Sequence, residues 1–284
     1  MSKIIDGKKI SAAVRDSVKA EVARLKENGI DTCLAVIIVG DDPASQVYVA
    51  NKERACEYTG IISRKYALPA DTKMEQLLAL IEELNNDSAV NGILCQLPLP
   101  RGLDEQKVIE AISPSKDVDA FTCGNVGRIM NGEYDFLPCT PAGIMEMLEY
   151  EGIDPAGKNC VVIGRSNIVG KPMAMLLLHK NGTVTICHSK TKNLAEITRS
   201  ADILVSAVGR AHFVTADMVK DGAVVIDVGM NRDENGKLCG DVCFSEVEPK
   251  ASKITPVPGG VGPMTIAVLM KNTLTAARRQ NNID

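Results

Sequence analysis

The segment 161–172 constrains the fold more than any other part of the sequence. An apolar run, Val161-Val162-Ile163, ends at Gly164, and Gly170 opens a new amphipathic segment. This order predicts a strand, a tight turn and a helix start, a connection that binds the pyrophosphate of dinucleotides in α/β proteins. Ser166 replaces the second glycine of the usual Gly-x-Gly-x-x-Gly pattern, and the last glycine comes one residue late, so an ordinary strand-to-helix turn also fits. The flanking sequence has to decide between the two.

Strand-like and helix-like segments alternate on both sides of this turn. Short β-branched runs predict strands at 34–39, 61–67, 92–95, 160–163, 183–187, 203–207 and 223–227. Apolar residues spaced three and four apart predict helices between them, whereas 113–138 has no clear period and is expected to be an interdomain crossing or an active-site loop. The alternation predicts two three-layer α/β domains with a cleft between them, the second of Rossmann type. We expect one domain at 1–139 plus 264–284 and the other at 140–263.

Composition and charge exclude several classes of protein. The 284-residue chain has a net charge of −4 and three histidines, which gives no basic surface for nucleic acid. It contains no tryptophan and few other aromatic residues on which bases could stack. Its apolar runs are too short to span a bilayer, and its first residues lack the apolar stretch of a signal peptide. We therefore expect a protein that uses neither nucleic acid nor membrane as a partner.

The nine cysteines are an odd number in a chain of this size. Several of them fall within predicted strands, where a reduced thiol packs as a small apolar side chain. Cys239 and Cys243 are separated by three residues, which is the wrong spacing for a zinc knuckle, and no second pair accompanies them. The cysteines predict a reducing, cytoplasmic location and no metal site.

Tyr48 and Lys52 are four residues apart in a predicted helix and therefore share one face. If that face is partly buried, the pKa of the lysine falls towards neutrality, and the amine can then both donate and accept a proton. A lysine that extends to water beside a packed tyrosine fits the same spacing. Gln96 follows a predicted parallel strand, where α/β sheets bind ligands, and could orient such a lysine or simply satisfy a turn.

Two further stretches carry polar side chains at predicted strand ends. Asp117 and Asp119 flank Val118, so alternation sends one towards a cleft and the other to solvent, although both could be solvated turn residues. A carboxylate in a cleft would suit a ligand with adjacent N–H donors. After the strand at 183–187 the chain has hydroxyl and cationic residues, Ser189 among them, instead of the carboxylate that holds the ribose of NAD. With Arg165 in the first turn, this pattern favours NADP.

Taken together, these segments resemble the bifunctional methylenetetrahydrofolate dehydrogenase/cyclohydrolase family. The matching pieces occur in family order across nearly the whole chain. They are Tyr48-Val49-Ala50-Asn51-Lys52, Gln96-Leu97-Pro98-Leu99-Pro100, Lys116-Asp117-Val118-Asp119, Pro138-Cys139-Thr140-Pro141-Ala142-Gly143, the segment from Gly164 to Pro172, Asp227-Val228-Gly229-Met230-Asn231, and the segment from Thr255 to Thr265.

The resemblance implies two reactions in one site and assigns a role to each residue. It implies NADP-dependent oxidation of 5,10-methylenetetrahydrofolate, then hydrolysis of the methenyl product to 10-formyltetrahydrofolate, within one-carbon metabolism and purine biosynthesis. Lys52 would be the central acid/base, oriented by Gln96, with Tyr48 packed over the reacting part of the folate. Folate would also be held by Asp119, Gly259, Gly260 and Pro263, and NADP by Gly164, Arg165, Ser166, Gly170 and Ser189. The family also implies a homodimer formed through the later domain.

One position departs from the family pattern, which usually continues Asp-Gly-Phe-His. This chain has Ala120 after Asp119, and alanine visits positive φ less readily than glycine, so a different loop geometry is expected here. Two other functions fit parts of the sequence. They are a two-domain NADP dehydrogenase of shikimate or amino-acid type, and a catalytically silent cofactor-binding or regulatory protein, against which the presence of Lys52 argues.

Overall fold

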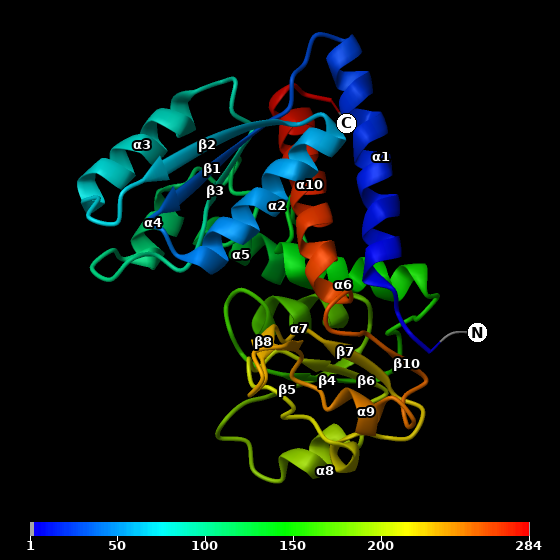
Figure 1. The fold of residues 1–284 in the computed structure, drawn as a ribbon. Coiled ribbons are helices and arrows are strands. Elements are labelled where there is room, and N and C mark those ends of the chain that lie inside the picture. The colour runs from blue at the N-terminus through cyan, green and yellow to red at the C-terminus, as the bar shows by residue number, and fades with distance from the viewer. Residues whose placement is uncertain (1–2, 284) are drawn as a thin grey trace. The chain divides into compact units, whose positions relative to one another are not determined.

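The computed structural model describes residues 3–283, and their contacts divide the chain into two compact units. One unit comprises 12–139 with 266–283, and the other comprises 3–11 with Thr140–Thr265. Each unit contains a parallel sheet covered by helices, which confirms the predicted α/β class (Figure 1). Residues 3–11 had been expected with the first unit. They pack in the second because the N–H of Ile5 donates to the carbonyl of Ile254 at 2.9 Å.

The first unit is built on a three-stranded parallel sheet with the order β2-β1-β3. In chain order its elements are α1 (Gly7–Glu27), β1 (Cys33–Val39), α2 (Pro43–Thr59), β2 (Ile62–Leu68), α3 (Met74–Asn86), β3 (Gly92–Cys95), α4 (Glu105–Ala111), α5 (Cys123–Asn131) and α10 (Val261–Gln280). Strand β1 is buried along its whole length, which is why its sequence is continuously apolar. Its alternate residues pack on α3 and α4, so the remaining ones face the side where α2 contacts the sheet.

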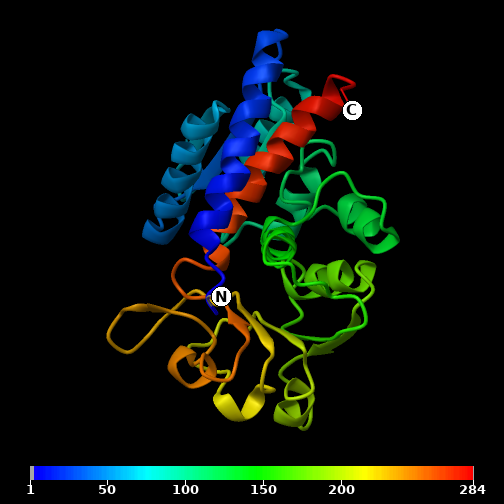
Figure 2. The same ribbon diagram turned by 90° about the vertical axis from the view of Figure 1, so that its right-hand side faces the viewer.

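The helix ends of this unit follow from local sequence. Asp42 is the N-cap of α2, and its side chain accepts a hydrogen bond from the N–H of Ser45 at 2.8 Å. Lys73 is the N-cap of α3, and its N–H donates to Gln76 Oε1 at 2.9 Å. The C-terminal parts of α1 and α10 lie side by side in Figures 1 and 2. An ion pair of 3.8 Å joins Arg278 of α10 to Glu21 of α1.

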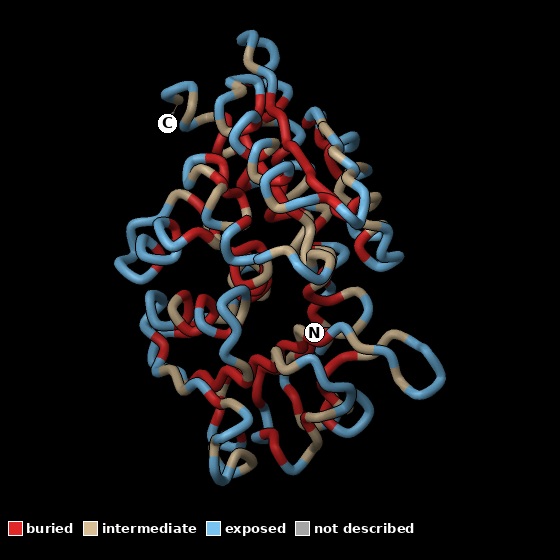
Figure 3. The backbone as a smooth tube through the Cα atoms, turned by 90° about the vertical axis from the view of Figure 1, so that its left-hand side faces the viewer, coloured by how far each residue is buried: buried red, intermediate tan, exposed pale blue. Residues whose placement is uncertain are grey.

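The second unit has a five-stranded parallel sheet with the order β10-β7-β6-β4-β5. Its elements are α6 (Cys139–Tyr150), β4 (Asn159–Ile163), α7 (Gly170–His179), β5 (Thr183–Cys187), α8 (Leu194–Thr198), β6 (Ile203–Ser206), the 3₁₀ turn η1 (Ala216–Met218), β7 (Val224–Asp227), the β8 (Asn231–Arg232) and β9 (Leu238–Cys239) hairpin, α9 (Phe244–Val247) and β10 (Lys253–Ile254). Strand β5 lies on one side of β4, whereas β6, β7 and β10 lie on the other side. The strand order therefore switches between β4 and β6, and such sheets bind ligands at this switch point. Strands β1, β3, β6 and β7 are buried along their whole length, and the buried segments run through the interior of each unit in Figure 3.

Candidate functional site

The first candidate centre is a cluster around the side chain of Lys52 on α2. Its ammonium donates a hydrogen bond to Gln96 Oε1 at 2.8 Å. Gln96 follows the last residue of β3, and its own amide donates to the carbonyl of Leu97 at 2.6 Å, so the orientation of its acceptor oxygen is fixed. The structure therefore brings together the lysine and the glutamine that the sequence singled out separately.

Burial lowers the proton affinity of this lysine. The pKa of Lys52 is lowered from its usual value because the surrounding protein desolvates the ammonium. The charge of Asp119 acts in the opposite direction and keeps part of the affinity for the proton. Tyr48, one helical turn earlier, is 39% exposed, and partial burial raises the pKa of its phenol. The face of α2 that carries Tyr48 and Lys52 is thus partly desolvated.

The carboxylate opposite the lysine comes from the irregular segment after α4. Residue 117 forms an isolated parallel bridge with Ile93, which places this segment beside β3. Burial raises the pKa of Asp119, and the charge of Lys52 opposes that rise. Asp117 does not reach solvent as alternation suggested. It is buried and accepts hydrogen bonds from the N–H of Thr122 and the amide of Asn125, both at 2.9 Å.

Two more residues belong to this cluster and were not assigned from the sequence. The thiol of Cys139 donates to Asp119 Oδ1 at 3.4 Å, and burial raises its pKa well above the usual value, so it acts as a neutral donor. Asn272 on α10 donates to the carbonyl of Val118 at 2.7 Å and to that of Leu137 at 2.8 Å. It thereby fixes the backbone next to Asp119. In the sequence, Cys139 was noted only as part of the family-like segment from Pro138 to Gly143. No sequence pattern pointed to Asn272.

Ala120 adopts the backbone conformation that glycine would favour. Its φ is +57°, and its side chain is fully buried. The N–H of Ala120 donates to the carbonyl of Asp117 at 3.0 Å, which closes the turn. The loop therefore reaches the left-handed conformation in spite of the alanine, at a cost of roughly 1–2 kcal/mol.

The second candidate centre is the turn between β4 and α7 in the other unit. Gly164 has a φ of +123°, and a Cβ at that position would lie 2.3 Å from the carbonyl oxygen of Ala207. A Cβ on Gly170 would lie 2.3 Å from the carbonyl oxygen of Gly164, so both glycines are required by close packing. Residues 165–168 are exposed, and α7 begins directly after them. This geometry fits a dinucleotide pyrophosphate, which needs a close backbone and a helix N-terminus.

The neighbouring strand supplies the groups expected around a 2′-phosphate. Ile163 pairs with Cys187 in parallel register, so the residues after β4 and β5 leave the sheet side by side. Ser166 Oγ accepts the N–H of Val169 at 3.2 Å, which shapes the turn, and Arg165 beside it is exposed. Ser189 is also exposed, and the N–H of Lys190 donates to His188 Nδ1 at 3.2 Å. No carboxylate follows β5 before residue 196.

Gly259, Gly260 and Pro263 lie in the connector that leads into α10. Gly259 has a φ of +103°. A Cβ on Gly260 would lie 2.5 Å from the carbonyl oxygen of Pro256, and a Cβ on Gly7 would lie 1.8 Å from that of Gly260. The connector therefore forms a tight turn against the start of α1. These contacts place the two glycines in the unit that contains Thr140–Thr265.

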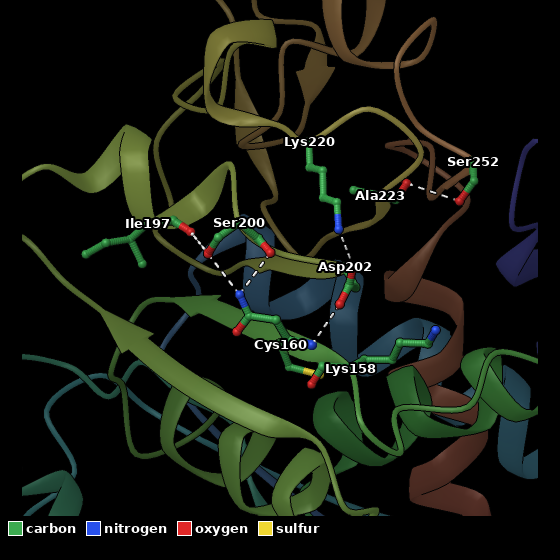
Figure 4. Close-up of polar contacts among 9 residues, drawn as sticks. Lys158, Cys160, Ile197, Ser200, Asp202, Lys220, Ala223 and Ser252 are labelled. Atoms are coloured by element: carbon green, nitrogen blue, oxygen red, sulfur yellow. Dashed lines mark hydrogen bonds and ion pairs between the residues drawn. The ribbon is translucent and has the colours of Figure 1, made fainter.

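A pocket of about 360 Å³ occurs in the second unit, at the amino-terminal ends of the strands of the five-stranded sheet. Asp202, just before β6, accepts a hydrogen bond from Lys220 Nζ at 2.5 Å and from the N–H of Asn159 at 2.9 Å (Figure 4). These two contacts lower the pKa of Asp202. The polar groups of the pocket thus largely satisfy one another, and they join the starts of β4 and β6 at the edge away from the dinucleotide turn.

Comparison with known proteins identifies two domains in the chain. Residues 5–119 match the model of the tetrahydrofolate dehydrogenase/cyclohydrolase catalytic domain, and residues 138–281 match that of the NAD(P)-binding domain. The chain belongs to the tetrahydrofolate dehydrogenase/cyclohydrolase family. Membership makes it an NADP-dependent methylenetetrahydrofolate dehydrogenase and a methenyltetrahydrofolate cyclohydrolase, as the resemblance implied.

Relatives of this family match the chain from end to end. The bifunctional protein FolD of Magnetococcus marinus is 61% identical over 284 residues, which is 100% of both chains. The crystal structure of the FolD enzyme of Campylobacter jejuni is 51% identical with a TM-score of 0.96, and the match covers 97% of this chain and 98% of that one. The Trypanosoma brucei dehydrogenase-cyclohydrolase, solved with NADP and an inhibitor, is 40% identical with a TM-score of 0.93 and covers 97% of each chain.

Proposed function

We propose that Lys52 is the proton-transfer group of the hydrolytic step, and that Gln96 orients it. The hydrogen bond between the two side chains is the observation that carries this assignment, together with the lowered pKa of the lysine. An amine with a pKa nearer to neutrality can take a proton from water and return it within one turnover. Lys52 is also the cation whose charge acts on Asp119.

The oxidative step depends on orientation. A hydride leaves the bridging methylene carbon of the folate, and NADP supplies its acceptor when bound. The carbon becomes a methenyl cation shared between two nitrogens. In this step the half-buried ring of Tyr48 packs against the folate and fixes the reacting carbon, and Asp119 accepts N–H donors of the pterin ring. The pKa of Asp119 is raised by burial, so ligand N–H donors would favour its charged form.

The hydrolytic step uses the amine. Water adds to the methenyl carbon while the neutral amine of Lys52 takes a proton from it. The carbon–nitrogen bond of the bridging ring then breaks, the leaving nitrogen receives the proton held by the amine, and the hydroxyl of the adduct loses its own proton to solvent as it becomes the carbonyl of the 10-formyl product. Water and the cation supply all the atoms, and one proton is released overall. The carbonyl oxygen of Gln96 keeps one N–H of the amine engaged, so that its lone pair stays in a fixed direction.

The remaining residues bind the two ligands in this proposal. The unit with residues 12–139 is the folate-binding catalytic domain, and the unit with residues 140–265 is the Rossmann-type NADP domain. The turn from Gly164 to Gly170, with Arg165 and Ser166, holds the NADP phosphates, and Ser189 lies near the 2′-phosphate. The connector residues Gly259, Gly260 and Pro263 shape the folate side of the active site.

We further propose a homodimer in a reducing, cytoplasmic environment. Strand β5 is the edge of its sheet, and it carries Ile186, which is 37% exposed, close in sequence to Leu178 of α7 at 50%. Exposed apolar side chains beside an open sheet edge suit a second copy of the chain. All nine cysteines are free thiols, and no helix in residues 3–283 is long and apolar enough to cross a membrane. Sedimentation of the purified enzyme measures its oligomeric state.

One assay tests the proposed function directly. The purified enzyme is mixed with 5,10-methylenetetrahydrofolate and either NADP or NAD, and the absorbance of the methenyl product is followed through its formation and decay. We expect formation that is faster with NADP, followed by decay to the 10-formyl product. Formation without decay would contradict the hydrolytic role, and equal rates with NAD would contradict the assignment of the 2′-phosphate site.

A further inference from the structure

Two buried aspartates lie at the carboxyl ends of the strands beyond the dinucleotide turn. Asp227 ends β7 and is 4% exposed, whereas Asp241 follows β9 and is fully buried. Burial raises the pKa of Asp227 to about 6, and the charge of Asp241 adds to that rise. Among the ion pairs of residues 3–283, none includes either carboxylate. Both charges are held by hydrogen bonds instead.

Asp241 collects donors from two different loops. Its Oδ2 accepts the N–H of Val208 at 2.7 Å, the N–H of Gly209 at 3.4 Å and the hydroxyl of Ser206 at 3.2 Å. Its Oδ1 accepts the N–H of Arg210 at 3.0 Å and the side-chain amide of Asn231 at 2.9 Å. One carboxylate thus fixes the backbone of 208–210 after β6 and, through the asparagine, the end of the loop 228–231 after β7.

Asp227 locks Asp241 in place. Its Oδ1 accepts the N–H of Gly229 and that of Asp241, and its Oδ2 accepts the N–H of Val242, all at 2.9 Å. The packing leaves no space for larger residues, since a Cβ on Gly229 would lie 2.3 Å from Asp241 Oδ1, and a Cβ on Gly240 would lie 1.8 Å from Asp227 Oδ2. The two glycines are therefore needed where the carboxylates meet the backbone.

These loops occupy the nicotinamide end of the proposed NADP site. In a Rossmann-type sheet the pyrophosphate lies on the first strand-to-helix turn and the adenosine lies towards the second strand, which is β5 here. The other half of the dinucleotide then extends over β6 and β7, on the opposite side of β4. The loop after β6 also touches the pyrophosphate turn, because the carbonyl of Ala207 packs directly against Gly164.

Buried charges without a cationic partner are expensive, and apolar residues would stabilise the unit equally well. What a carboxylate adds is a fixed set of backbone donors in two loops at once. We propose that Asp241 is a positioning residue for hydride transfer, which holds the loops 207–210 and 228–231 in the geometry that orients the nicotinamide. This inference rests on the proposed location of the NADP site.

Asp241→Asn tests the proposal because an amide keeps the size but cannot accept hydrogen bonds on both sides. We expect the dehydrogenase kcat to fall about 10²-fold, as for a misplacement of about 1 Å. The cyclohydrolase kcat and the affinity for NADPH should change by less than about threefold, because Asp241 makes no hydrogen bond to the phosphate turn or to Lys52. The deuterium isotope effect on kcat, measured with substrate labelled at the bridging methylene, should rise as hydride transfer becomes slower.

Two further variants keep this test decisive. Asp233→Asn is the matched control, since Asp233 accepts only the N–H groups of its own hairpin turn, and it should behave as wild type. Ser206→Ala provides the test should Asp241→Asn fail to fold. It removes a single donor to Asp241, so it should lower the dehydrogenase kcat several-fold. Losses of both activities in parallel, with an unchanged isotope effect, would overturn the positioning role.

The location of the cofactor site is tested separately. Gly170→Ala places a methyl group against the carbonyl of Gly164, so it should abolish NADPH binding, measured by the fluorescence of the reduced nicotinamide. Normal NADPH affinity in Gly170→Ala would overturn the proposed cofactor site and the role of Asp241 with it. A normal dehydrogenase kcat in folded Asp241→Asn, with Gly170→Ala inactive, would overturn the role of Asp241 alone.

Discussion

We expect replacement of Lys52 by methionine to separate the two reactions of the enzyme. Methionine has nearly the length of the lysine side chain, so the packing beside Tyr48 is kept, but it has no basic nitrogen. The partner oxygen of Gln96, which accepts a hydrogen bond at 2.8 Å in the wild type, loses its donor. We expect the cyclohydrolase activity to be abolished and the dehydrogenase activity to be reduced less, because hydride transfer depends on orientation and not on a proton acceptor.

The magnitude follows from what the amine contributes. General acid–base catalysis by one positioned group accelerates a reaction by about 10²–10⁴-fold. Loss of the amine should therefore lower the cyclohydrolase kcat by at least about 10²-fold, which corresponds to roughly 2.7 kcal/mol of transition-state stabilisation. The assay follows the decay of preformed methenyltetrahydrofolate, so it does not depend on the oxidative step. Lys107→Met, on the exposed surface of α4, is the matched control and should leave both activities unchanged.

The pH dependence of the wild type tests the same reasoning. Burial lowers the pKa of Lys52, so the amine loses its proton at a lower pH than an exposed lysine with a pKa of about 10.4. Since the neutral amine takes the proton from water, the cyclohydrolase kcat should rise with pH and level off above the pKa of Lys52. Its midpoint should lie below about 10.4. A midpoint at the ordinary lysine value, or near-normal hydrolysis by Lys52→Met, would refute the argument.

Three other substitutions have expected outcomes. Gln96→Ala leaves the amine of Lys52 without its orienting acceptor, so the cyclohydrolase kcat should fall about tenfold, in line with roughly 1.4 kcal/mol for one hydrogen bond. Gly170→Ala forces a Cβ to within 2.3 Å of the carbonyl of Gly164, and calorimetric unfolding should show a loss of about 1–3 kcal/mol besides the loss of NADPH binding. Ala120→Gly relieves a φ of +57° and should raise the free energy of unfolding in denaturant by up to about 1 kcal/mol; a decrease would show that the buried methyl group matters more than the strain.

Most strands could be predicted from the sequence, because a strand that is buried on both faces has a continuously apolar sequence. Strand β1 and strands β4, β6 and β7 of the second sheet read as short apolar runs rich in β-branched residues, and their positions agree with the structure to within about two residues. Strand β10 was not predicted, because it is only two residues long. Helix α5 was missed because its nine residues include Gly124 and Gly127, which have poor helix propensity. Tertiary packing of Ile129 and the N-cap at Thr122 stabilise it instead.

Residues of the catalytic cluster were found where they sit in a readable local pattern. Tyr48 and Lys52 share a helix face by their spacing, and Gln96 follows a strand, so each could be singled out. Asn272 lies 154 residues from Val118, whose carbonyl it holds, and Cys139 meets Asp119 across 20 residues. Such contacts form only when the backbone has folded, and no periodic pattern in the sequence predicts them.

The pKa shifts of Lys52 and Asp119 could not be predicted from the sequence either, because each shift depends on the balance of two opposing effects. Desolvation lowers the pKa of Lys52 and raises that of Asp119, while their mutual attraction acts against both shifts. The spacing of residues supplies the attraction but not the degree of burial that outweighs it. A ligand that brings N–H donors to Asp119 would further stabilise its charged form. A more strongly held charge on Asp119 would raise the pKa of Lys52, so binding of folate itself would adjust the proton affinity of the lysine that we propose as the proton-transfer group.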